Sequence, residues 1–260
     1  MSRKSIDRTG EEKINNFGSK MVIKEYRKYS DIDVYFPKYN WTFKHTRYDS
    51  FKKGEIKCPY ELREYNIGYT GEGKYKKSKN GKLTKCYIAW HNMLMRCYDI
   101  KYQEKYPTYK GTEVCKEWLN FQNFAKWYYE YYYEVENDRV ELDKDILVKG
   151  NKLYSPETCV FVPRRINTLF TKRTNDRGSL FIGVTPDAHH KKFIAYCDNL
   201  EGDQIRLGLF EREIDAFLCY KQYKENVMKK IIDIYEGIIP EHTFYKLKEA
   251  MYNYEVEITD

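Results

Sequence analysis

The sequence predicts an α+β protein in which small antiparallel sheets alternate with amphipathic helices. Three observations predict it: a period-two apolar pattern near the N-terminus, two helical apolar stripes in the middle, and a strand–strand–strand–helix order over residues 178–236. A chain of 260 residues is long for one compact core and suits two or three domains. We therefore expect a small β module (1–60), a central α+β domain (61–172), a C-terminal domain (178–236) and a helical tail (237–260).

The N-terminal module is predicted from short strand-like stretches at residues 21–23, 32–36 and 41–43. Turn-forming residues separate these stretches, as expected for a compact β module: Gly18, Pro37, Gly54 and Pro59. The residues leave its role open between a barrel that helps to dock DNA and a cap that only supports folding.

Two helices are predicted in the central domain. Over residues 86–99, large apolar side chains recur at the i, i+3, i+4 and i+7 positions of one helix face: Trp90, Met93, Leu94 and Cys97. Residues 116–133 carry a second such face, made of Trp118, Phe121, Phe124, Ala125 and Tyr128. Stripes of this kind are typical of a core, so we assign them to packing and not to a ligand site.

The C-terminal domain is predicted as three antiparallel strands packed on one helix. The expected strands are Phe181–Thr185, Lys192–Leu200 and Gln204–Phe210, and the expected helix is Glu211–Tyr235. Alternation turns these side chains of the second and third strands inward: Phe193, Ala195, Cys197, Ile205 and Leu207. Phe210, at the end of the third strand, is assigned to the same inward side. Apolar positions on the helix include Ile214, Phe217, Leu218 and Val227.

Residues 178–236 resemble the Apetala/ethylene-response-factor type of DNA-binding domain, which also occurs in phage homing endonucleases. The similarity lies in Gly183-Val184 after an aromatic residue, in 192–195, in 207–210, in 211–217 and in Tyr220. It implies that the outward face of the sheet enters the major groove of double-stranded DNA. The implied contacts are Ile182, Thr185, Lys192, Ile194, Tyr196, Gln204 and Arg206. The family often has arginine or tryptophan at the positions of Ile182, Thr185 and Ile194, so fewer charged contacts to bases are expected here.

Residues 142–146 and 150–159, together with the aromatic segment that precedes them, resemble the HNH-type nuclease core of phage and intron-encoded endonucleases. The resemblance implies a ββα-metal-like domain that holds one divalent ion, Mg²⁺ or Mn²⁺, next to a general base. Carried over by position, Asp143 and Thr158 stand at the metal-ligand positions, and Asn151 is a residue that holds the loop.

The same segment departs from the nuclease pattern at two positions. Lys144 stands where the family has its general-base histidine, and Thr158 stands where it has a metal-binding asparagine or histidine. An unperturbed lysine side chain has a pKa of about 10.4 and is therefore a proton donor at neutral pH. His91 could substitute as the base and Asp145 could supply a second carboxylate, which completes the candidate catalytic set.

The positive charge of the chain is concentrated in one short run. The formal net charge is +7 and the pI is near 8.8, but residues 73–82 alone contain five lysines and an Asn-Gly turn signal. Such a run forms either a solvated hairpin or a contact with phosphates, and on the second hypothesis Lys76, Lys77 and Lys79 bind DNA. The 27 tyrosines are explained either by AT-rich codons or by a need for aromatic surfaces.

Seven widely spaced cysteines with no Cys-x-x-Cys pair argue against a disulfide framework and against a zinc ribbon. The N-terminus lacks the apolar core of a signal peptide, and the chain has no apolar run long enough to span a membrane. We expect a soluble protein of the cytoplasm, which would be the host bacterial cytoplasm for a phage protein.

Three functional hypotheses remain open from the sequence. The first is a homing-endonuclease-like enzyme that nicks or cuts DNA with Mg²⁺ or Mn²⁺, and the second is a catalytically inert DNA-binding protein that needs no cofactor. The third is a phage inhibitor that binds a host defence protein. Asp143→Ala would abolish plasmid nicking under the first hypothesis only.

Overall fold

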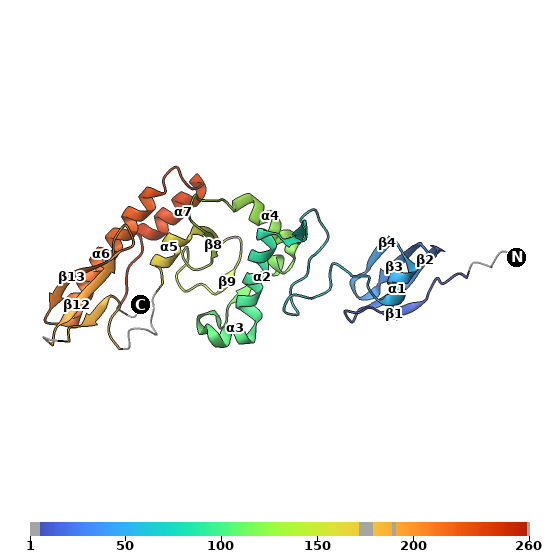
Figure 1. Cartoon of the computed structure of the whole chain (residues 1–260), viewed down its shortest axis with the longest axis horizontal. Coiled ribbons are helices and arrows are strands. Elements are labelled where there is room, and N and C mark those ends of the chain that lie inside the picture. The colour runs from blue at the N-terminus through green and yellow to red at the C-terminus, as the bar shows by residue number, and fades with distance from the viewer. Residues whose placement is uncertain (1–5, 172–178, 189–190, 259–260) are drawn as a thin grey trace. The chain divides into compact units, whose positions relative to one another are not determined.

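A computed structural model describes residues 6–171, 179–188 and 191–258 (Figure 1). The chain divides into two compact units, Met1–Tyr129 and Glu130–Asp260. The boundary between them falls within the predicted central domain, residues 61–172. The predicted limits at residues 172 and 178, and the last two residues of the predicted tail, lie outside the described residues.

The first unit begins with an antiparallel sheet in the order β1-β2-β3-β4, which confirms the predicted β module. Its elements are β1 (Glu12–Ile14), β2 (Lys20–Lys28), β3 (Asp31–Phe36), the 3-10 turn η1 (Pro37–Tyr39), β4 (Trp41–Thr46) and helix α1 (Tyr48–Lys53). Alternate side chains of β2 and β3 are fully buried and pack on Phe51 of α1, as the period-two pattern requires.

The second part of this unit is mainly helical. Its elements are the hairpin β5 (Ser78–Lys79) and β6 (Lys82–Leu83), α2 (Lys85–Tyr98), α3 (Ile100–Lys105), η2 (Pro107–Tyr109), β7 (Glu113–Val114), η3 (Lys116–Leu119) and α4 (Phe121–Tyr131). The predicted helix at 86–99 is confirmed by α2, whose four predicted core residues are all buried.

The prediction of one helix over residues 116–133 is wrong, because the chain is extended at Asn120. The peptide groups on either side of Asn120 pair with Tyr69, and the Asn120 side chain accepts a hydrogen bond from the N–H of Gln122 (3.0 Å). An asparagine in this position caps the start of a helix. A short 3-10 turn therefore precedes α4, although the predicted apolar face is buried throughout.

In its described residues, the second unit contains a two-stranded and a three-stranded antiparallel sheet together with three helices. Its elements are β8 (Val140–Asp143), β9 (Leu153–Tyr154), β10 (Val160–Pro163), α5 (Arg164–Leu169), β11 (Val184–Pro186), β12 (Phe193–Asp198), β13 (Gln204–Phe210), α6 (Glu213–Ile234) and α7 (Glu241–Tyr252). The strand β8 pairs with β10, and β11, β12 and β13 form the three-stranded sheet. The α+β class and the sheet packed on one helix are thus confirmed.

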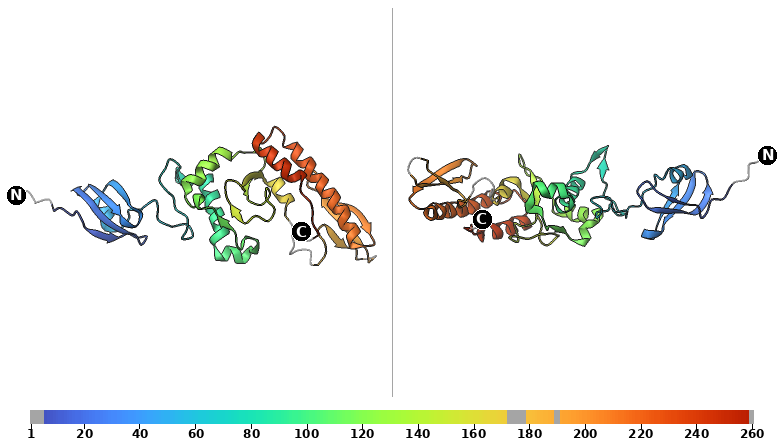
Figure 2. Two further views of the ribbon diagram at one scale, coloured as in Figure 1. Left: turned by 180° about the vertical axis from the view of Figure 1, so that it is seen from behind. Right: turned by 90° about the horizontal axis from the view of Figure 1, so that it is seen from below.

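Helix α6 belongs to two hydrophobic cores at once. Its first half packs on the three-stranded sheet through Ala216, Phe217 and Tyr220. Its second half joins the core of β10, α5 and α7, where Met228 and Ile232 are fully buried. The helix runs along one side of the sheet in both views of Figure 2. The sheet is therefore coupled through one continuous helix to the rest of the second unit.

The predicted C-terminal domain differs from the structure in two local features, one in a strand and one in the helix. The first strand begins at Val184 and not at Phe181, because Val184 donates a hydrogen bond to the Phe181 carbonyl across a turn that contains Gly183 (φ +76°). On the helix, Leu218 is 52% exposed, since it lies away from the face that packs on the sheet.

Among the described residues, none of the helices has the length and apolar character needed to cross a membrane.

Candidate nucleic-acid interface

The three-stranded sheet presents its residues in rows across the face that α6 does not cover. The strand register places Thr185, Ile194 and Leu209 in one row. A second row contains Tyr196 and Arg206, and a third contains Asp198 and Gln204. Thr185, Gln204, Arg206 and Leu209 are exposed, whereas Ile194 and Tyr196 are half-buried. Five of the predicted contacts, Thr185, Ile194, Tyr196, Gln204 and Arg206, therefore share this outer face.

A β-bulge explains how inward and outward side chains can follow each other on β13. Strict alternation from Leu207 would turn Phe210 outward, but the register shifts between Ala195 and Tyr196. On the Tyr196 side of the shift Arg206 opposes Tyr196, and on the Ala195 side Phe210 opposes Phe193. The bulge restores Phe210 to the core and turns Leu209 outward with 39% of its surface exposed. Leu209 was not predicted as a contact, since the register shift leaves no mark in the sequence pattern.

The other two predicted contacts lie at the margin of this face. Ile182 is in the turn before β11 and packs, half-buried, against the core between sheet and helix. Lys192 precedes β12, and its ammonium group forms an ion pair with Glu211 (2.6 Å). With Asp198 on the face as well, the outer face is mixed in charge and not strongly basic.

The lysine-rich run forms the hairpin of β5 and β6, as its Asn-Gly turn predicts. Asn80 and Gly81 both have positive φ (52° and 74°), the geometry of a tight two-residue hairpin turn. The side chains of Lys76, Lys77 and Lys79 are all exposed. Lys77 lies 3.5 Å from Glu64 and 4.4 Å from the centre of the Tyr87 ring.

Asp143 ends strand β8 and holds the turn that follows. Its Oδ1 accepts hydrogen bonds from the backbone N–H groups of Asp145 and Ile146, both at 2.8 Å. Burial raises the pKa of Asp143 to about 6, and the nearby charge of Asp145 adds to the effect. One of the two carboxylate oxygens of Asp143 is therefore engaged by the backbone of the turn.

The side chains of the neighbouring candidate site residues also form local hydrogen bonds. The buried Lys144 donates to the carboxylate of Asp145 (3.0 Å), so its ammonium group is a donor. Asn151 donates to the carbonyl groups of Lys144 and Leu153, each at 2.7 Å, which agrees with a residue that holds the loop. Thr158 donates to the Leu153 carbonyl (2.8 Å). The donor set around Asp143 does not fit the metal site that the nuclease resemblance implies.

His91 lies on α2 in the first unit, whereas Asp143 belongs to the second. Its Nδ1 is 2.9 Å from Glu64 and its Nε2 is 3.3 Å from the hydroxyl of Tyr65. Tyr87 also donates a hydrogen bond to Glu64, and the pKa of Glu64 lies below its ordinary value, with burial opposing the hydrogen bonds that lower it. Because Glu64 is 27 positions from His91 in the chain, no sequence spacing indicated this pair.

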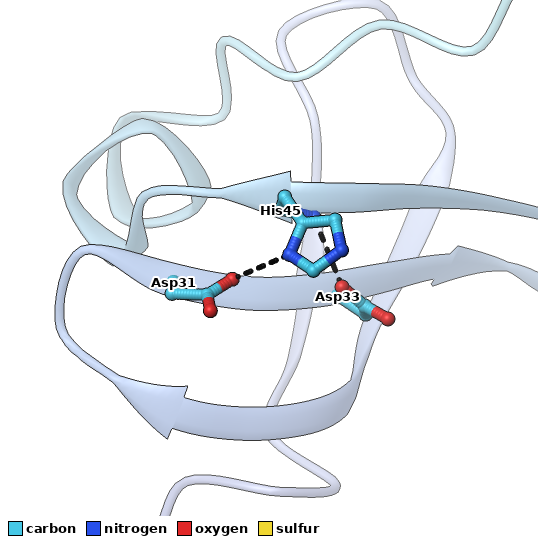
Figure 3. Close-up of side chains that lie close together, drawn as sticks. All are labelled: Asp31, Asp33 and His45. Carbon is cyan, nitrogen blue, oxygen red and sulfur yellow. Dashed lines mark hydrogen bonds and ion pairs between the residues drawn. The ribbon is translucent and has the colours of Figure 1, made fainter.

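Among the residues that the structure describes, one group of three side chains has ligand atoms close enough together to hold a metal ion: Asp31, Asp33 and His45 (Figure 3). In this cluster, His45 Nδ1 is 3.0 Å from Asp31, and its backbone N–H donates to Asp33 (2.9 Å). Arg27 donates to both carboxylates, and these bonds lower the pKa of Asp31 and of Asp33. The guanidinium group thus already supplies the positive charge that a metal ion would bring.

Comparison with known protein families, with curated proteins and with solved structures returned no match.

Proposed function

We propose that this protein binds double-stranded DNA, with the outer face of its three-stranded sheet in the major groove. The observation that carries the proposal is a sheet with one face packed on α6 and the other face exposed in ordered rows. Neighbouring strands lie about 4.8 Å apart, so the outer strands are separated by roughly 10 Å. That width suits a groove about 12 Å wide.

The side chains on this face suit the edges of base pairs. Arginine can pair with guanine and glutamine with adenine through two hydrogen bonds each, and apolar side chains contact the methyl group of thymine. Arg206 and Gln204 supply the polar groups, and Ile194 and Leu209 supply the apolar row. The mixed charge of the face favours contacts to bases over contacts to phosphates.

The lysine hairpin, residues 76–82, is a separate basic surface on the first unit that suits phosphates. Phosphate neutralisation makes affinity fall with salt, by a slope that grows with the number of contacts. The segment 76–81 belongs to an exposed hairpin and contains no acidic residue. Its three lysines are Lys76, Lys77 and Lys79. We therefore expect most of the salt dependence of binding to come from the first unit.

Arg206→Gln is expected to weaken duplex binding about 10-fold, the effect of losing one base contact of 1–3 kcal/mol. Fluorescence anisotropy of the full chain with a labelled duplex measures it. The matched control is Lys230→Gln, which removes one positive charge from an exposed position on α6. Equal losses for the two variants would contradict a specific role for the outer face. An absence of duplex binding, with stable co-purification of another protein, would favour the inhibitor hypothesis instead.

Cleavage is not part of the proposal, because Lys144 and Thr158 are each engaged in a local hydrogen bond and Asp143 Oδ1 accepts two bonds from the backbone. Supercoiled plasmid incubated with Mg²⁺ or Mn²⁺ is expected to stay supercoiled with the wild type and with Asp143→Ala alike. Agarose gel electrophoresis reads the result. Metal-dependent nicking by the wild type that Asp143→Ala abolishes would establish the nuclease hypothesis and overturn this part of the proposal.

A further inference from the structure

Two tyrosines form a stacked pair beside the lysine hairpin. The ring centres of Tyr75 and Tyr129 are 5.2 Å apart, and the ring planes differ by 13°. Tyr129 comes from α4 and keeps 57% of its surface exposed in spite of this stack. The ammonium group of Lys74 lies 5.2 Å from the centre of the Tyr75 ring. An aromatic ring with one face on Tyr75 and much of the rest in solvent is a platform on which another flat ring can stack.

The backbone around this platform is held in place by specific hydrogen bonds. Gln122 of α4 accepts from the N–H of Tyr75 and donates to its carbonyl, both at 3.0 Å. Gly73 passes so close to Gln122 that a Cβ atom on it would lie 2.2 Å from that side chain. At the other end of the segment, the hydroxyl of Thr84 donates to the carbonyl of Lys76 (3.2 Å). The platform is thus preorganised, which reduces the entropy lost on binding.

The segment that carries Tyr75 has charge of one sign, although Glu64 pairs with Lys77 and the exposed Glu130 follows Tyr129 in the chain. Residues 73–85 contain six lysines and no acidic residue. Lys74, Lys76, Lys79 and Lys82 are all exposed. The combination of a stacking ring with a lysine-rich segment matches polynucleotide strands, in which planar bases and phosphates alternate.

We propose that the Tyr75–Tyr129 platform and the lysine hairpin bind an unpaired strand of DNA. One base stacks on the exposed face of Tyr129, and the lysines hold the adjacent phosphates. An unpaired strand is required because the faces of bases in a duplex are covered by their neighbours. This site lies wholly in the first unit; it shares the lysine hairpin with the phosphate contacts proposed above but does not depend on the three-stranded sheet.

Tyr129→Ala is expected to weaken the binding of labelled twelve-residue oligothymidine to the full chain about 10-fold, since stacking on an aromatic side chain contributes at this level. Tyr129→Phe keeps the ring and is expected to bind as the wild type does. The control is Tyr245→Ala, which removes a tyrosine of matched exposure (59%) from α7 in the second unit. Tryptophan fluorescence verifies folding, because all four tryptophans lie in the first unit.

The other outcomes are equally decisive. Equal affinity of Tyr129→Ala and the wild type for oligothymidine would overturn the stacking proposal, as would an equal loss in Tyr245→Ala. Tenfold tighter binding of oligouridine than of oligothymidine would overturn the assignment to DNA in favour of RNA. Arg206→Gln is expected to leave oligothymidine binding unchanged, so failure of the duplex proposal would be seen separately from failure of this one.

Discussion

Gly183→Ala is expected to destabilise the three-stranded sheet by about 3 kcal/mol, the sum of overpacking and a left-handed backbone at a residue with a side chain. A Cβ atom at this position would lie 2.2 Å from the ring of the buried Tyr220, and the φ angle is +76°. The carbonyl of Gly183 also accepts a hydrogen bond from Tyr196 (2.9 Å), so displacing this residue would disturb the outer face. Loss of duplex binding should accompany the loss of stability.

The turn between β12 and β13 provides a matched control for this substitution. Gly202 also has a positive φ (+94°), but an added Cβ atom would have no neighbour within 4 Å. Gly202→Ala is therefore expected to cost only the backbone strain, about 1–2 kcal/mol. Hydrogen exchange of the amides in β12 and β13 measures both effects in the full chain. Equal losses of protection would show that contact with Tyr220 is not what requires glycine at position 183.

The elements that the sequence predicted well are those whose pattern is local. On α2 every predicted core residue is buried, and β13 has the predicted limits of Gln204 and Phe210. These patterns follow from the periods of helix and strand and need no information on tertiary neighbours. The Asn-Gly hairpin is local in the same sense, because both turn residues adopt positive φ without help from elsewhere.

The features that could not be predicted depend on residues far apart in the chain. The break before α4 comes from Tyr69, which pairs with the backbone on both sides of Asn120. The platform depends on Gln122, which holds Tyr75 across 47 positions. The lysine run was predicted as either a solvated hairpin or a phosphate contact, and only the tertiary structure reveals that its backbone is anchored beside an exposed ring.

The candidate catalytic set illustrates a different limit. A resemblance places Asp143, Lys144 and Thr158 at functional positions, but the role of each depends on its hydrogen bonds. In this chain the three side chains bind the turn, Asp145 and a backbone carbonyl, respectively. The residue types at these motif positions predicted a loop held by local hydrogen bonds, whereas the chemistry that the resemblance implies for them stays a prediction.

Asp143→Asn is expected to stabilise the second unit at pH 7.5 by up to roughly 3 kcal/mol, since one pKa unit corresponds to about 1.4 kcal/mol. The pKa of Asp143 is raised from 3.8 to about 6 by burial and by Asp145, so the folded protein favours the protonated carboxyl. The stability that this group contributes is complete below pH 3.8 and is lost as the pH rises through about 6. An asparagine stays neutral, and its oxygen can still accept the two backbone hydrogen bonds of the turn.

Hydrogen exchange of β8 and β10 from pH 4 to pH 8 tests this expectation, with Asp203→Asn as a control at an exposed turn. The advantage of Asp143→Asn should fall steeply between pH 6 and pH 4 and vanish only below the unfolded pKa of 3.8, where the carboxyl is protonated in both states. A divalent ion bound by Asp143 would reverse the result, because binding to the folded state alone stabilises it by mass action. Stabilisation of the wild type by Mg²⁺ or Mn²⁺ at pH 7.5, absent in Asp143→Asn, would therefore identify a metal site and restore the case for cleavage. Our expectation is that added metal leaves the difference between the two proteins unchanged, because the turn and Lys144 already occupy the groups that an ion would need.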